Sequence, residues 1–304
     1  MKELIKRIII SRTCKWKKNK LLSKYFDKIV KPLEFRYKFN PSFYIDDDVK
    51  IMAFRVIKNG KKISSYVYIE DKKDKSLINI SKEFVSKLGV RQLIDPKVTL
   101  LNDGIYLTFN TGWSPDGNDI FIMKIYSEQE SPKKIIYRGR LKYERNWSFF
   151  SKDGELYALY WLNPLKILRL KEKRNHEWEF EDYYSDNKIN KNIPEDITIG
   201  TQLCLKDNKY YFVAHEKIKM KNKKIYFGRP ALFDFENKKI IFGKKMLIHS
   251  FLSLLGNKFK TNGNLLSCTY FSGIQIKGNK IILGYGVNDI ETRFCQLNID
   301  SFLE

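Results

Sequence analysis

The chain has 304 residues, of which 43% are apolar and 14% aromatic, and its formal net charge is +22. This length and composition allow a large buried core and exclude a disordered protein. No apolar run approaches the roughly 18–20 residues that span a bilayer, and the N-terminus lacks the long apolar centre of a signal peptide, so we expect a cytoplasmic protein.

Residues 1–38 form a basic segment that differs from the rest of the chain. Eleven Lys and Arg residues stand before Pro32, and apolar residues recur at helical spacing: Leu4, Ile5, Ile8, Ile9, Leu21, Leu22, Tyr25, Phe26, Ile29 and Val30. A basic amphipathic helix can lie on an anionic membrane surface, where each cation contributes on the order of 1 kcal/mol. The protein would then be peripheral at the inner face of the membrane. The alternative is a helix packed on the side of the domain, with its lysines in water.

From Phe39 onward, short alternating strands replace helical periodicity, except around Ser81–Leu88 and His249–Leu255. Turn signals rich in Asn, Asp and Gly separate the strands at residues 58–61, 102–104, 152–154, 206–208, 236–237 and 277–279. The best-defined example is the predicted hairpin over residues 93–110, which turns at Asn102-Asp103-Gly104. This pattern indicates an all-β sandwich, barrel or propeller.

A structural repeat favours the propeller. Five short segments each precede a strand, a tight turn and another strand: Phe39–Ser42, Ile94–Lys97, Arg145–Ser148, Gly200–Gln202 and Phe271–Gly273. Their starts lie roughly 50–70 residues apart, close to the period of a four-stranded blade. We therefore predict a five-bladed β-propeller over residues 39–304, preceded by the basic, partly helical segment 1–38.

Several chemistries find no support in the sequence. The chain has no dinucleotide-binding, Walker, nucleophile-elbow or zinc-protease motif. Its four cysteines form no Cys-x-x-Cys pair and its three histidines lack metal-ligand spacing, so we expect no metal site and no cofactor. The positive charge favours anionic partners, or reflects abundant lysine on a solvated surface. No nucleic-acid-binding motif accompanies it, so nucleic acid is not the expected partner.

A series of short motifs supports a more specific expectation. In chain order they are Phe39-Asn-Pro-Ser42, Met52-Ala-Phe-Arg55-Val56, Asp95-Pro-Lys97, Arg145-Asn-Trp-Ser148, Leu162-Asn-Pro164, the strand ending at His215, and Tyr285-Gly-Val-Asn-Asp289. Together they resemble the five-bladed propeller family of β-mannoside phosphorylases and hydrolases and the related β-1,2-mannosyltransferases. The resemblance is closer still to propeller domains that accompany glycosyltransferases, and it spans about residues 39–299.

The resemblance implies that Asp95 is a proton donor, because the family's donor is the Asp of a Glu-Asp-Pro-Arg motif. It also implies basic residues that bind phosphate. Ile94 and Lys97 stand where the family has Glu and Arg, which weighs against phosphorolysis. Glycosyl transfer needs an acid or base at the bridging oxygen, and a carboxylate with restricted solvation suits that role. The alternative is that Asp95 only caps a turn before Pro96.

Other polar residues at strand ends are candidates for the sugar pocket. Arg55 lies in an apolar run, where a cation needs a partner; it can bind sugar or phosphate, or pair with an acid such as Asp95. His215 can contact phosphate or a hydroxyl, or be a satisfied core residue. The remaining substrate-binding candidates are Asn40, Arg145, Asn146, Asn163, Thr201, Tyr285 and Asp289, with Gly286 allowing close backbone approach and Trp147 equally suited to the blade core.

The leading hypothesis is a glycosyltransferase that acts in surface polysaccharide synthesis, with Asp95 as general acid/base. Its partners would be a sugar donor, either a nucleotide sugar or a sugar phosphate, and a glycan acceptor. One alternative is an inverting glycoside phosphorylase or hydrolase acting on β-mannoside-like substrates. Another is a non-catalytic glycan-binding propeller.

Overall fold

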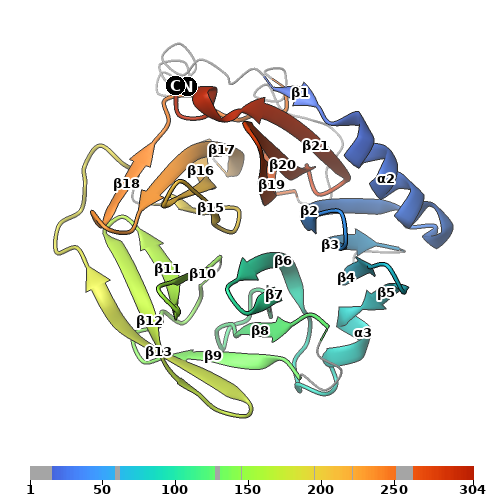
Figure 1. Ribbon diagram of the computed structural model, residues 1–304, viewed down its shortest axis with the longest axis horizontal. Coiled ribbons are helices and arrows are strands. Elements are labelled where there is room, and N and C mark those ends of the chain that lie inside the picture. The colour runs from blue at the N-terminus through green and yellow to red at the C-terminus, as the bar shows by residue number, and fades with distance from the viewer. Residues whose placement is uncertain are drawn as a thin grey trace.

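The computed structural model describes residues 16–58, 62–126, 131–144, 146–194, 196–220, 222–250 and 263–304. Strands make up 57% of these described residues and helices 8%. The strands of the described residues form five blades arranged in a ring, with the first strand of each blade nearest the centre (Figure 1). The predicted five-bladed β-propeller is confirmed.

Blades 1 to 3 are regular four-stranded antiparallel units. Blade 1 contains β2 (Tyr37–Ile45), β3 (Lys50–Ile57), β4 (Ile63–Glu70) and β5 (Lys75–Asn79), and the short helix α3 (Ile80–Phe84) follows it. Blade 2 contains β6 (Ile94–Leu101), β7 (Gly104–Asn110), β8 (Ile120–Lys124) and β9 (Lys133–Tyr137). Blade 3 contains β10 (Ser148–Lys152), β11 (Glu155–Leu162), β12 (Leu165–Lys173) and β13 (Glu177–Ser185). The outer strands β9 and β13 pair in parallel and join blades 2 and 3.

Blades 4 and 5 depart from this regularity. In blade 4 the innermost strand is split into β14 (Thr198–Ile199) and β15 (Cys204–Lys206), followed by β16 (Lys209–Met220), β17 (Lys223–Asp234) and β18 (Lys239–Phe242). Blade 5 contains β19 (Leu265–Lys277), β20 (Lys280–Val287), β21 (Glu291–Asn298) and β1 (Lys17–Lys18). Because β1 comes from the N-terminal segment, the pairing of Lys17 with Gln296 closes the ring.

The hairpin turns use the residue types that tolerate a left-handed backbone. Asp153, Asp207 and Asn208 have φ of 51°, 51° and 57°, and Gly278 has φ of 57°. Asn, Asp and Gly adopt this left-handed region at the lowest cost, which is why these residue types occupy the turns between the strands. Of the other predicted features, the turn at 58–61 falls largely, and the helix at His249–Leu255 mostly, outside the described residues.

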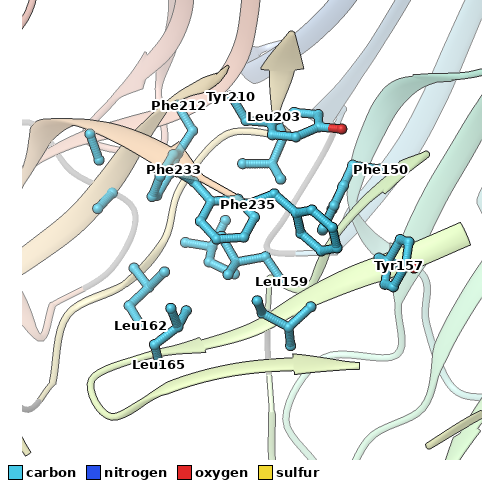
Figure 2. Packing of buried hydrophobic residues seen from close by; sticks show 14 of the residues in the cluster. Phe150, Tyr157, Leu159, Leu162, Leu165, Leu203, Tyr210, Phe212, Phe233 and Phe235 are labelled. Atoms are coloured by element: carbon cyan, nitrogen blue, oxygen red, sulfur yellow. The ribbon is translucent and has the colours of Figure 1, made fainter. Parts of the chain in front are cut away.

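The core consists of apolar layers between neighbouring blades. Figure 2 shows the layer between blades 3 and 4, where Phe150 packs against Tyr210, Phe233 and Phe235 with ring centroids 4.8, 5.6 and 5.5 Å apart. Tilted and edge-on aromatic pairs of this kind stabilise packing beyond the area they bury. These layers fix the angles between blades and hence the positions of the inner strand ends.

The N-terminal helix α2 (Lys20–Val30) packs on the outside of the ring. Asn19 caps it by accepting a hydrogen bond from the Leu22 backbone N–H at 3.0 Å. The Phe26 ring lies 5.1 Å from Phe54 of blade 1 and 5.8 Å from Phe294 of blade 5. This is the arrangement expected of a helix packed on the domain; residues 1–15 lie outside the described part. Among the described helices, none is long and apolar enough to cross a membrane.

A candidate active site at the centre of the propeller

The inner strands of blades 1 to 3 present polar side chains at equivalent positions. Asn40, Asp95 and Asn146 have φ of 54°, 53° and 67°. Asn40 is the fourth residue of β2, Asp95 is the second residue of β6, and Asn146 stands two residues before β10. In β2 and β6 the residue is followed by proline, and the strand register shifts there, between Phe39 and Ser42 and between Ile94 and Lys97. Such bulges re-aim side chains at the end of a strand. The repeated segments of the sequence therefore place three polar groups at one end of the central ring.

Asp95 forms a buried ion pair with Arg55. The Arg55 guanidinium donates to Asp95 Oδ1 at 2.8 Å, and the two side chains are 11% and 2% exposed. Arg55 comes from β3 and its guanidinium lies 5.0 Å from the centre of the Phe39 ring. The ion pair with Asp95 was one of the roles that the sequence suggested for Arg55, and the structure shows that it forms. It joins a cation of blade 1 to the carboxylate of blade 2.

Lys97 adds a second buried cation beside Asp95. Its Nζ donates to the Gly200 carbonyl at 2.6 Å and to Asn146 Oδ1 at 3.3 Å. Burial lowers the pKa of Lys97 to about 8, while the charge of Asp95 opposes this shift. Lys97 was not among the predicted site residues; its position two residues after Asp95 in the Asp-Pro-Lys motif was the signal for it.

His215 of β16 is a further buried group that lies close enough to Lys97 to be affected by its charge. Its ring is buried and contacts Tyr270 of β19, with centroids 4.1 Å apart. Burial and the positive charge of Lys97 lower the pKa of His215 to about 3, so the imidazole is neutral at pH 7. The Tyr270 hydroxyl donates to Asn146 Oδ1 at 3.3 Å. Tyr270, which directly precedes the fifth repeated segment, is a second residue that the sequence analysis missed.

Several buried polar atoms in this region have no hydrogen-bond partner among the described residues. They are the side-chain amide atoms of Asn40, Arg55 Nε, His215 Nε2 and Asn288 Nδ2. Native proteins satisfy nearly all buried polar groups, so such a cluster indicates a place where a polar ligand binds. Asn40 packs on Gly286, where a Cβ atom would lie 2.0 Å from Asn40 Oδ1. Gly286 is therefore required for the close approach of Asn40.

Asn163 and Thr201 use their polar groups within the fold. The amide of Asn163 donates to the carbonyls of Asn190 and Ile193 at 3.0 Å and accepts the Asn190 N–H at 2.8 Å. The Thr201 hydroxyl donates to the Gln202 carbonyl at 2.9 Å and accepts the Val213 N–H at 3.0 Å. Both side chains therefore bond to the backbone and not to Asp95, Arg55 or Lys97.

The other predicted residues are distributed as follows. Tyr285 packs between Trp16 and Phe271 and lines a cleft of about 660 Å³ beside α2, and Asp95 is not among the residues that line this cleft. Asp289, with φ of 57°, follows Asn288 in the turn after β20. Trp147 is buried in the core of blades 2 and 3, and Arg145 lies outside the described residues. Within the described part of the chain, no group of three or more His, Cys, Asp or Glu side chains could hold a metal ion.

Comparison with known proteins supports the assignment of the fold. No protein family matches the chain by sequence, and no curated protein does. Among solved structures, the β-1,2-mannobiose phosphorylase of Listeria innocua in complex with β-1,2-mannobiose has a TM-score of 0.58 and 14% identity, over 88% of this chain and 91% of that chain. A glycosyl hydrolase from Bacteroides ovatus has a TM-score of 0.58 and 11% identity, over 88% and 85%.

A third match comes from the GH130 family of mannoside phosphorylases, which contains hydrolases that target β-1,2-mannosidic linkages in Candida mannan. Its TM-score is 0.58 and its identity 12%, over 87% of this chain and 85% of that chain. The protein therefore has the fold of five-bladed propellers that act on glycosides. More particularly, its fold is that of the β-mannoside phosphorylases and hydrolases named here.

Proposed function

We propose that the protein is a carbohydrate-active enzyme that cleaves or forms a glycosidic bond at the centre of the propeller, with an anionic co-substrate. Its best-supported form is an inverting phosphorylase of β-mannoside-like substrates. The observation that carries this proposal is the buried carboxylate of Asp95, which pairs with Arg55 and lies within the electrostatic influence of Lys97. It lies at the end of the ring where several buried polar atoms have no hydrogen-bond partner among the described residues.

The proposed roles follow from charge. In cleavage, Asp95 gives a proton to the bridging oxygen as the bond to the anomeric carbon breaks, and phosphate forms the new bond to that carbon. In synthesis the ionised carboxylate takes the proton of the acceptor hydroxyl, and phosphate leaves with the bonding electrons. A positioned acid or base of this kind contributes about 10²- to 10⁴-fold to the rate.

The surrounding groups suit an anion. Arg55 retains a buried Nε–H without a partner among the described residues, and Lys97 supplies a second positive charge. Planar guanidinium groups bind phosphate oxygens well, and buried cations attract anions more strongly than exposed ones. An arriving phosphate would share these cations with Asp95, which favours proton uptake by the carboxyl group. Neutral His215 and the amide of Asn40 are placed to bind sugar hydroxyls.

A glycosyltransferase is the second candidate. The formal charge of +22 favours a donor that carries phosphate, such as a sugar phosphate or a nucleotide sugar. The replacement of the family's Glu and Arg by Ile94 and Lys97 also favours a change in the anionic partner. Both candidates assign the same role to Asp95, so the donor distinguishes them.

The test is to incubate the protein with β-1,2-mannobiose, with and without inorganic phosphate, and separately with mannose nucleotide sugars and a mannose acceptor. We expect phosphate-dependent formation of mannose 1-phosphate, reduced at least about 100-fold in kcat/KM by Asp95→Asn. Asp153→Asn, in the turn at the opposite end of blade 3, is the matched control.

Three other outcomes are informative. Release of free mannose without phosphate would identify a hydrolase, and product formed only from a nucleotide sugar would identify a transferase. Turnover that survives Asp95→Asn would refute the assignment of the general acid/base. Absence of turnover on every glycoside and donor would refute the enzyme and leave a glycan-binding propeller.

A further inference from the structure

A cleft of about 510 Å³ lies beside the proposed active site, between the connection from blade 1 to blade 2 and the loops of blade 2. Its lining combines one aromatic ring with amide, hydroxyl and charged groups, among them Arg91, Gln92, Trp113, Ser114, Asn118 and Lys142. This composition matches that of ligand pockets, in which an apolar surface is joined by a few convergent polar groups.

Each wall of the cleft leads directly to the central site. Gln92 stands three residues before Asp95, so their Cα atoms are at most about 11 Å apart along an extended chain. Thr111 directly follows Asn110, whose partner across the β6–β7 pair is Ile94. Lys142 stands four residues before Asn146. The residues that line the cleft therefore lie at the same end of the ring as Asp95.

Trp113 is displayed in this cleft on a well-anchored loop. Its side chain is 65% exposed. Before it, Gly112 has φ of 73° and donates its N–H to Asn110 Oδ1 at 2.8 Å. A Cβ atom on Gly112 would lie 2.4 Å from the Gln92 amide nitrogen, so this glycine permits the packing of Gln92 against the loop.

The far side of the loop is tied to blade 2 and to the connection that leads into blade 3. Thr111 and Asp119 form two hydrogen bonds, of 3.0 and 2.9 Å. The Asn118 side chain accepts the Glu144 N–H at 2.8 Å and donates to the Glu144 carbonyl. The buried Glu144 carboxylate in turn accepts the Trp147 indole N–H at 3.1 Å. A loop fixed by so many contacts presents Trp113 in a preorganised position, which reduces the entropy cost of binding.

The cleft continues along the same end of blade 1. Arg91 and Gln92 also line a second cleft of about 380 Å³, whose other lining residues include Lys62, Ser64 and Lys82. A path lined by polar groups and by charged groups of both signs thus runs from Trp113 past the segment that precedes Asp95. An elongated ligand whose reacting end lies at Asp95 would extend along it.

We infer that this cleft binds the non-reacting part of an oligosaccharide, with a sugar ring stacked on Trp113. A pyranose ring has an apolar face of C–H groups and a rim of hydroxyls, which correspond to the indole face and to the amide and hydroxyl groups of Gln92 and Ser114. The inference rests on the proposed function and specifies its substrate as a glycan chain longer than a disaccharide.

The experiment measures binding of β-1,2-linked manno-oligosaccharides of two to six units by calorimetry, in the Asp95→Asn background that prevents turnover. We expect affinity to rise with chain length. Trp113→Ala should remove this rise, a loss of about tenfold for the longest chains, while the affinity for the disaccharide stays unchanged. Trp113→Phe, which keeps an aromatic face, should retain most of it. Leu205→Ala, which truncates an exposed apolar side chain at the other end of a blade 4 inner strand, should have no effect.

The outcomes separate this inference from the proposed function. If the disaccharide binds but affinity does not depend on length, the cleft is not a glycan subsite and the central site stands. If long chains bind through Trp113 while the disaccharide does not bind, the cleft is supported as a glycan-binding subsite and the assignment of the central site is refuted. If no chain of any length binds, both are refuted for this class of glycan.

Discussion

Removal of the charge on Lys97 gives the most direct test of the central site. Burial lowers the pKa of Lys97 to about 8, from 10.5 for a solvated lysine. Between these two pH values the unfolded chain binds a proton at this position and the folded protein does not, so the free energy of unfolding rises with pH. Each pH unit in this interval contributes about 1.4 kcal/mol. Burial of the charged amine therefore costs free energy below pH 8, and this cost is fully relieved above pH 10.5.

The magnitude follows by integration between two accessible pH values. From pH 7 to pH 9.5 this one group should add about 2 kcal/mol to the free energy of unfolding. Many other groups titrate over the same range, so the useful quantity is the difference between wild type and Lys97→Met. We expect urea denaturation to show that wild type gains about 2 kcal/mol relative to this variant over that interval. Lys72→Met, which removes an exposed lysine, is the control and should show no such gain.

A difference between wild type and Lys97→Met that is independent of pH would refute this reasoning, because it would mean that Lys97 titrates like a solvated lysine. Inorganic phosphate provides a second arm of the experiment. If phosphate binds beside Lys97, its negative charge favours the protonated amine, and the rise in stability should move to higher pH. Sulfate at the same ionic strength tests whether the shift requires a particular anion.

Three further predictions concern the framework of the site. Asn163→Ala removes three hydrogen bonds to the backbone at residues 190 and 193. Urea denaturation should show a free energy of unfolding lower by about 2–3 kcal/mol, while kcat stays near wild type. A selective loss of kcat would instead place Asn163 at the substrate. Gly286→Ala places a methyl group 2.0 Å from Asn40 Oδ1. We expect calorimetry to show a loss in the free energy of substrate binding that is larger than the loss in the free energy of unfolding. Unchanged binding would exclude Asn40 from the site. Phe26→Ala should destabilise the protein by about 3–4 kcal/mol through the cavity left beside Phe54, and an effect below 1 kcal/mol would show that α2 is not docked in solution.

Local sequence accounts for much of the fold. The Asp, Asn and Gly residues at 153–154, 207–208 and 278 produce tight turns because those residue types adopt a left-handed backbone at little cost. Alternating apolar residues between the turns define the strands, and the interval between repeated segments predicts the number of blades. The same local chemistry marks Asn40 and Asp95, since each precedes a proline at a bulge.

The partners of the site residues could not be read from such patterns. Arg55 meets Asp95 across 40 residues, Lys97 meets the Gly200 carbonyl across 103, and Tyr270 meets Asn146 across 124. Asn163 resembles a sugar-binding residue in sequence, but its amide holds the backbone at residues 190 and 193. Each of these contacts joins blades or loops whose separation is set by the aromatic layers between blades.

The sequence by itself determined the class of fold, the positions of the turns and the carboxylate most suited to acid/base chemistry, because each depends on residues that are close along the chain. Only the tertiary structure decided that Arg55 and Lys97 flank that carboxylate, that His215 is buried and neutral, and that Trp113 faces a cleft beside it. Closure of the ring brings these groups together, and closure depends on the packing of all five blades at once.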